Sequence, residues 1–287
     1  MKFPHGDGVS RESRLGVVLR QVEGEYRQGF LHTDPVEFPR RYRNRLDREA
    51  AAFLTAGLSY GAVPQIRRSV SNLLERLGPG LSATLRNSSQ AALTRRLRGF
   101  VHRWSRGPDV AGVAGTVGKI QRRWVSLENF FREGDPGGED LIQAASSFSR
   151  RAFALAGPKA GRGVEWFFPD PGRGSASKRL FLFLRWMVRP DDGVDLGVWK
   201  SLSPSRLIIP LDTHLYRIGW GLRLTRRKTP DLEAALEITR NLRTLDPQDP
   251  TRFDFALCRL GILNRCSGRA GKAFRKTCPL YGLCRHR

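Results

Sequence analysis

Two stretches in the second half of the chain combine residue types that could do chemistry at the start of a helix. The first is Pro171-Gly172-Arg173-Gly174, followed by Ser175 and then by Lys178-Arg179. Two glycines two positions apart allow the backbone to turn sharply and to expose its amides to a phosphate. Many loops before helices have a similar composition, so this motif alone leaves an anion site and an ordinary turn both open.

The second stretch is an apolar run over residues 207–211 that ends in Asp212-Thr213-His214. Aspartate and threonine are favoured just before the first turn of a helix, so Asp212 is expected to cap a helix whatever else it does. A single histidine in such a place is more often a buried, hydrogen-bonded side chain than a base or a ligand. Spacing alone therefore leaves the capping and catalytic interpretations of Asp212 open.

The net charge restricts the class of partner. The chain has 50 basic and 27 acidic residues, a formal net charge of +23 and a pI near 11.2. Such a field attracts polyanions, of which nucleic acid is the usual one. A protein that is merely arginine-rich, or that associates with ribosomes, is the alternative. The first ten residues hold no apolar run, and the longest one, over 180–184, is too short to cross a bilayer. We expect a cytoplasmic protein that binds DNA, with RNA as an alternative, and no membrane.

The elements that must position these residues are helices. Apolar residues recur at helical spacing over 66–77 and 141–152, and Gly157-Pro158 should end the second of these helices. Further helices are expected over 175–189, from Thr229-Pro230 to about 242, and within 253–263. Residues 157–174 and 190–204 are rich in loop-forming residues, and strand signals are scarce. The pattern predicts an all-α fold.

The order of these segments resembles a known superfamily. A glycine hairpin, an amphipathic helix and an apolar run into Leu211-Asp212-Thr213-His214 are similar to the helix-hairpin-helix (HhH-GPD) DNA glycosylases. The stretches 175–189, 207–217 and 253–257 more closely resemble an uncharacterised, divergent branch of it, a domain of unknown function. The likeness covers residues 46–263.

This resemblance implies a two-lobed helical protein, a monomer, with a central cleft for DNA. One lobe would span residues 49–190 and end in the helix-hairpin-helix, and the other would combine 1–48 with 191–287. The target nucleotide would be rotated out of the stack into a pocket between the lobes. By this likeness Asp212 is the catalytic carboxylate, which stabilises the cationic sugar as the base leaves and orients a water molecule.

The sequence also offers candidate contacts to the substrate. We expect the base pocket to hold Tyr60, His102 and Trp166, although packing in the core is the more common role of each aromatic residue taken singly. The residues expected to contact DNA are Gly172, Arg173, Gly174, Ser175, Lys178, Arg179, His214 and Arg217.

The lysine position departs from the family pattern. Bifunctional members carry a lysine two residues after the second hairpin glycine, and here that position is Ala176. The nearest lysine, Lys178, lies 34 residues before Asp212, because residues 190–204 look like an insertion. We therefore predict a monofunctional enzyme that uses water. A lyase that uses Lys178 and a non-catalytic nucleic-acid binder on the same scaffold are the alternatives.

The cysteines depart from the pattern as well. Relatives with an iron–sulfur cluster have the spacing Cys-x6-Cys-x2-Cys-x5-Cys, whereas this chain has Cys258-x7-Cys266-x11-Cys278-x5-Cys284. The closing Cys-Pro-Leu-Tyr-Gly-Leu-Cys segment matches the end of that loop, and Cys258 would have to replace a missing ligand. The four cysteines predict a [4Fe-4S] cluster or zinc, with free thiols as the alternative.

Overall fold

The computed structural model describes residues 11–27, 29–263, 266 and 277–285. Within these residues α-helices dominate, and the short strands β1 (Val101–His102) and β2 (Ser105–Arg106) pair antiparallel as a hairpin. The all-α class predicted from the sequence is confirmed. No helix in the described segments combines the length and the hydropathy needed to cross a bilayer.

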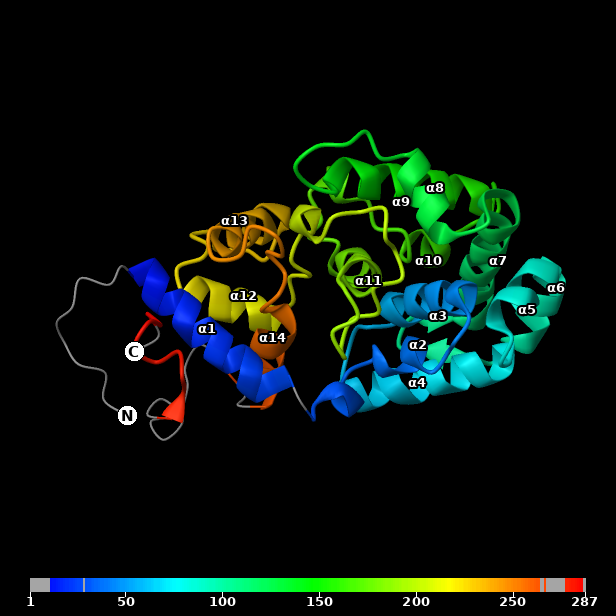
Figure 1. The fold of residues 1–287 in the computed structure, drawn as a ribbon. Coiled ribbons are helices and arrows are strands. Elements are labelled where there is room, and N and C mark those ends of the chain that lie inside the picture. The colour runs from blue at the N-terminus through cyan, green and yellow to red at the C-terminus, as the bar shows by residue number, and fades with distance from the viewer. Residues whose placement is uncertain (1–10, 28, 264–265, 267–276, 286–287) are drawn as a thin grey trace.

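Four helices lie together at one end of the molecule (Figure 1). They are α1 (Arg11–Arg27), α12 (Thr213–Gly221), α13 (Leu232–Arg243) and α14 (Asp254–Leu263). Both α1 and α12 pack against α14, and α13 packs against α12. The segments that form this end are thus far apart in the sequence.

A larger group of helices forms the other end, where α7 contacts α5, α6, α8, α9 and α10. The members are α2 (Glu37–Arg40), α3 (Arg45–Gly57), α4 (Val63–Leu77), α5 (Leu81–Asn87), α6 (Gln90–Arg96), α7 (Gly107–Trp124), α8 (Leu127–Glu133), α9 (Ile142–Ala156) and α10 (Arg162–Glu165). Helix α11 (Lys178–Val188) lies centrally in Figure 1 and packs on α3. Short 3-10 turns, η1 (Leu31–Thr33), η2 (Pro171–Arg173) and η3 (Pro204–Arg206), complete the chain.

The helices follow the apolar pattern where that pattern is strong. In α4 the buried residues are Ile66, Val70, Leu73, Leu74 and Leu77, which is the face that the sequence predicts. Helix α9 ends at Gly157, whose φ of +97° lies in the region that favours glycine.

Helix α13 begins two residues later than the sequence predicts, at Leu232 instead of Pro230. The cap is Asp231, whose carboxylate accepts from the Ala234 amide at 2.9 Å, while the Thr229 hydroxyl donates to Asp231 at 2.7 Å. Thr229 and Asp231 are both residue types that cap helices, and Asp231 is the one that occupies the cap position.

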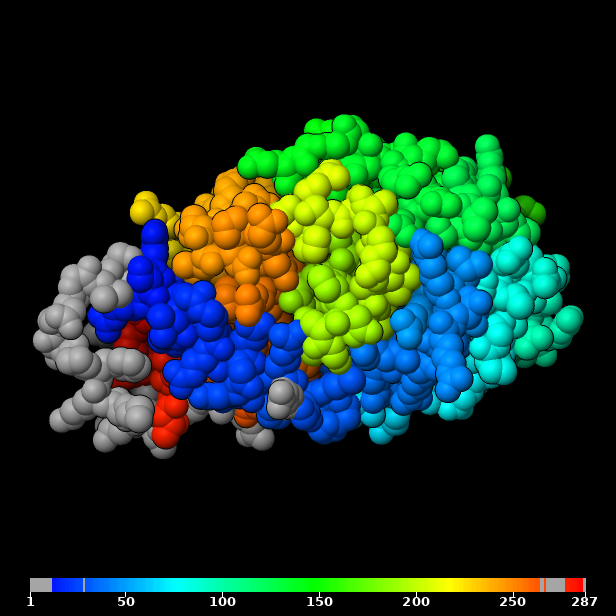
Figure 2. Space-filling model, viewed as in Figure 1, coloured from blue at the N-terminus to red at the C-terminus, as the bar shows by residue number. Residues whose placement is uncertain are grey.

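The segment over 190–204 packs against α3, α8 and α11 through buried side chains and does not form a separate unit. Figure 2 shows it in yellow-green between the orange and blue surfaces. Trp199 is 1% exposed and contacts the rings of Phe131 and Phe183, with centroids 5.5 and 5.2 Å apart. The Trp199 indole donates to the buried carboxylate of Glu49 at 3.0 Å. The insertion is therefore part of the core.

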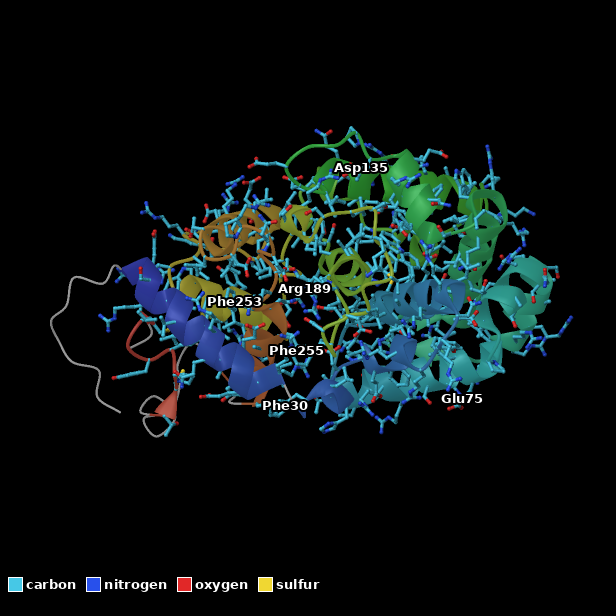
Figure 3. The ribbon with its side chains drawn as sticks, viewed as in Figure 1. Phe30, Glu75, Asp135, Arg189, Phe253 and Phe255 are labelled. Carbon is cyan, nitrogen blue, oxygen red and sulfur yellow. The ribbon has the colours of Figure 1, made fainter. Side chains whose placement is uncertain are left out.

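Buried ion pairs connect α11 to both this segment and α14. Arg185 pairs with Asp195 at 3.1 Å and with Asp254, and Arg189 pairs with Asp249 at 2.8 Å. Figure 3 shows Arg189 near the middle of the molecule. Breaking one member of a buried pair leaves an uncompensated charge, so these contacts fix the position of α11 relative to α14.

Candidate functional site

A hollow of about 1060 Å³ lies where the starts of α11 and α12 meet. Its walls come from residues 59–61, 149–153, 162–179, 211–214 and 230–231, so both ends of the molecule contribute. Among the described residues that line it, none comes from 190–204. Nine residues of the predicted site line this hollow: Tyr60, Trp166, Arg173, Gly174, Ser175, Lys178, Arg179, Asp212 and His214.

Asp212 both caps a helix and borders the hollow. Its Oδ1 accepts a hydrogen bond from the Leu215 amide at 2.7 Å, as expected for the residue that precedes α12. Its Oδ2 accepts from the Cys258 thiol at 3.3 Å, and the residue is only partly buried. Asp212 can therefore cap α12 and border the hollow at the same time, so the capping and catalytic interpretations do not exclude each other.

Two groups of α14 lie near Asp212: the partly buried Cys258 thiol and the buried Asp254 carboxyl group. Burial, and then the negative charge of Asp212, raise the pKa of the Cys258 thiol well above its usual value, so it stays a protonated donor. Burial raises the pKa of Asp254 to about 6, although the paired Arg185 opposes this shift. The side chains of α14 that lie near Asp212 are therefore poorly solvated.

The glycine hairpin uses its own amides to hold its shape. The Gly172 amide donates to the Asp170 carboxylate and to the Ser146 hydroxyl, each at 2.9 Å, and the Gly174 amide donates to the Pro171 carbonyl at 2.9 Å. Gly174 has φ +84° and closes the turn. The phosphate contacts predicted for Gly172 and Gly174 stay a prediction, and their amides already have partners within the protein.

The next two amides are available. The backbone N–H groups of Ser175 and Ala176 make no hydrogen bond within the described part of the chain, and both residues line the hollow. Ser177 follows with φ +43°, a strained value for serine, and α11 begins at Lys178. Free amides before a helix start can bind an anion.

Lys178 lies at the entrance to α11 and is partly buried. Its ammonium group forms no hydrogen bond or ion pair with any described residue, and it lines the same hollow as Asp212. It acts electrostatically on the Cys258 thiol, which itself contacts Asp212. Lys178 and Asp212 therefore border the same hollow, although the sequence separates them by 34 residues.

An aromatic cluster forms one wall and extends out of the hollow. The Tyr60 ring packs edge-on to Trp166 at 6.0 Å and stacks with Trp104 at 4.7 Å. The Arg179 guanidinium lies 4.2 Å above the Trp166 ring and donates to the Gly57 carbonyl at 2.8 Å. The sequence analysis did not identify Trp104 as part of this cluster. The feature that could have indicated it is a tryptophan between Arg103 and Arg106 in a polar segment.

Three residues predicted for DNA contacts or the base pocket do not line the hollow: Gly172, His102 and Arg217. His102 is fully buried and does not line the hollow; its ring nitrogens bond to Ser69 Oγ at 2.9 Å and to the Tyr60 carbonyl at 3.1 Å, and burial lowers its pKa. It therefore supports Tyr60 from within the core. Arg217, in the second turn of α12, is likewise not among the described residues that line the hollow.

The cysteines separate into two places. Cys266, Cys278 and Cys284 line a small apolar hollow of about 30 Å³, whereas Cys258 faces Asp212. The described residues contain no group of three or more histidine, cysteine or acidic side chains arranged to hold a metal ion. Most of the loop between Cys266 and Cys278 lies outside the described residues. The iron–sulfur or zinc site on four cysteines stays a prediction.

Comparison with known proteins identifies a family. No curated protein and no solved structure matches the chain. A family model described as a protein of unknown function, DUF2400, matches residues 34–263, which include every residue that lines the hollow. The chain belongs to the DUF2400 family.

Proposed function

We propose that this protein is a DNA glycosylase, which hydrolyses the N-glycosidic bond of a damaged or modified base. The observation that carries this proposal is the position of Asp212, which borders a hollow that is also lined by Ser175 and Ala176, whose amides make no hydrogen bond within the described part of the chain. In this proposal the helix groups at the two ends of the molecule act as two lobes, and the DNA strand lies across the hollow between them.

The hollow has room for an extruded base. A volume of about 1060 Å³ is at the upper end of small-molecule sites, and Tyr60 and Trp166 offer aromatic surface to a flipped base. Arg150 and Arg162 line the hollow and have no ion pair within the described part of the chain, so they are suited to phosphate contacts.

The reaction needs one carboxylate and one water molecule. The bond between C1′ and the base nitrogen breaks, and the base leaves with the electron pair and takes up a proton from solvent. The sugar becomes oxocarbenium-like, and the negative charge of Asp212 stabilises it. Water adds to C1′ through its oxygen and gives a proton to Asp212, so the products are a free base and an abasic site.

A second candidate activity rests on Lys178. Its amine borders the same hollow without a partner among the described residues. In its neutral form it would add to C1′ in place of water, the base would leave with the bonding electrons and a proton, and an imine would link the protein to the opened sugar. Borohydride reduces such an imine to a stable amine, so trapping that disappears in Lys178→Ala would identify this activity.

A panel of oligonucleotides tests the proposal. Purified protein is incubated with duplexes that each carry one damaged or modified base, and alkali then cleaves any abasic site. Cleavage at a lesion that is lost in Asp212→Asn supports the glycosylase. Binding to these duplexes without base release from any of them supports the non-catalytic binder instead.

A further inference from the structure

Two exposed tryptophans lie side by side next to the hollow. Trp104 is 53% exposed and Trp166 is 42% exposed, and no other described tryptophan is this exposed. Their rings pack edge-to-face with centroids 5.6 Å apart. Exposed aromatic surface of this kind is unfavourable in water unless a partner covers it.

The cluster is held rigidly before any partner arrives. The Tyr60 hydroxyl donates to the His102 carbonyl at 3.0 Å and also hydrogen-bonds to Ser105 Oγ at 2.7 Å. Tyr60 is therefore fixed to both strands of the β1–β2 hairpin, which carries Trp104 at its turn. We call Tyr60, Trp104 and Trp166 the aromatic shelf.

Two arginines pack over rings of the shelf. The Arg103 guanidinium lies over the Trp104 ring, 5.0 Å from its centre, and the Arg179 guanidinium lies over the Trp166 ring at 4.2 Å. Aromatic rings and guanidinium planes both stack on unpaired bases, and the charge of the guanidinium attracts the phosphates of a single strand. A hydrophobic protein partner would gain nothing from these two charges.

The shelf also continues into the hollow. Tyr60 and Trp166 line the hollow, whereas Trp104 does not. A strand whose target base occupies the hollow would therefore place an adjacent base near Trp104. Bases within a duplex already stack on one another, so only an unpaired neighbour presents a free face.

We propose that the aromatic shelf stacks an unpaired base adjacent to the target, so that the protein binds single-stranded nucleic acid more tightly than a fully paired duplex. This inference deepens the proposed function by naming the form of the substrate, and it rests on that function only for the identity of the base in the hollow.

Direct binding tests the shelf. The full chain is titrated with a fluorescein-labelled 12-nucleotide DNA of mixed sequence, single-stranded or annealed to its complement, and with the RNA of the same sequence. Wild type is expected to prefer both single strands over the duplex. Trp104→Ala is expected to weaken single-strand binding about tenfold, from the loss of one stacked base, while Trp104→Phe keeps most of the affinity.

A matched control is available on another face. The Arg123 guanidinium lies over the Trp124 ring at 4.6 Å, the same pairing as Arg103 and Trp104, but Trp124 packs against Phe130 and is not part of the aromatic shelf. Arg103→Ala should weaken single-strand binding, and Arg123→Ala should leave it unchanged.

Equal affinity of wild type for single strand and duplex, or a Trp104→Ala variant that keeps its single-strand affinity, overturns the inference. The titration measures binding alone and requires no base release. Loss of the proposed catalysis would therefore leave this test unaffected.

Discussion

The carboxylate of Asp212 is held by two donors of different kinds. The Leu215 amide fixes one oxygen, and the Cys258 thiol, kept protonated by burial, contacts the other at 3.3 Å. A carboxylate fixed at both oxygens has one orientation, and a fixed orientation toward the sugar is what charge stabilisation requires. Cys258 is therefore a positioning residue in this account.

Removing the thiol should affect turnover more than binding. For Cys258→Ala we predict a kcat about fivefold lower with little change in KM, because a neutral hydrogen bond contributes about 1 kcal/mol. Cys258→Ser retains a donor and should restore most of the loss. Steady-state kinetics of the three proteins checks this. Equal kcat in Cys258→Ala and wild type would show that the contact has no catalytic role.

At the scale of elements, close packing between helices positions the walls of the hollow. Helix α7 passes α5 so closely at Gly118 that an added Cβ would lie 2.1 Å from the Leu85 carbonyl oxygen. That oxygen belongs to the backbone and can move only if the helices separate. α7 also packs on α9 and α10, which contribute walls of the hollow.

Gly118→Ala should therefore lower the free energy of unfolding, by about 1–3 kcal/mol from overpacking. Gly24→Ala is the matched control, because Gly24 is exposed in α1 and its Cβ would meet nothing within 4 Å. That variant should be neutral or slightly more stable, since alanine favours helices over glycine. Urea unfolding of both variants measures the difference, and equal stability would mean that the helices can separate freely.

The sequence predicted the elements better than the contacts between them. Apolar periodicity placed the buried face of α4, and the Asp-Thr pair marked the start of α12. The Cys258 contact to Asp212 joins residues 46 positions apart, and the pair of Arg185 and Asp254 joins residues 69 apart. Local patterns carry no information about such partners.

The hollow, too, is formed by residues that lie far apart in the sequence. Its walls join residues from 59 to 231, and Trp104 reaches the aromatic shelf through a hairpin of two-residue strands, too short to produce a periodic signal. From the sequence, only the resemblance to a known superfamily suggested that the glycine hairpin, Lys178 and Asp212 belong to one site. In the structure Gly174, Lys178 and Asp212 line the same hollow.

At the scale of the whole molecule, one buried carboxylate joins distant segments. Glu49 on α3 is fully buried and accepts from the Leu127 amide at 2.8 Å and from the Trp199 indole at 3.0 Å. Burial raises its pKa from 4.5 to about 7, and these donors together with Arg45 oppose the shift. The insertion over 190–204 is thereby tied to the helices beneath it.

This carboxylate should make stability depend on pH. Between pH 4.5 and about 7 the folded protein keeps a proton on Glu49 that the unfolded chain has released. The free energy of unfolding should therefore fall as pH rises through this window, with the contribution complete below pH 4.5 and lost above about 7. The free energy of unfolding of Glu49→Gln, measured by denaturant titration, should fall less steeply over the same pH range. Identical slopes for the two proteins would exclude Glu49 as the source.

The most direct test of the central claim compares the rate of base release by the wild type and by a variant that lacks the Asp212 carboxylate. With a lesion substrate from the panel, single-turnover base release should fall at least ~100-fold in Asp212→Asn, because a charge-stabilising or general-base group contributes about that much. Asparagine can still cap α12, so the fold and the binding of the substrate should be retained.

Asp140→Asn is the control, since Asp140 also accepts an amide at a helix start, from Ile142 at 2.9 Å, but lies outside the hollow. It should release the base at the wild-type rate. Base release by Asp212→Asn at the wild-type rate would contradict the account.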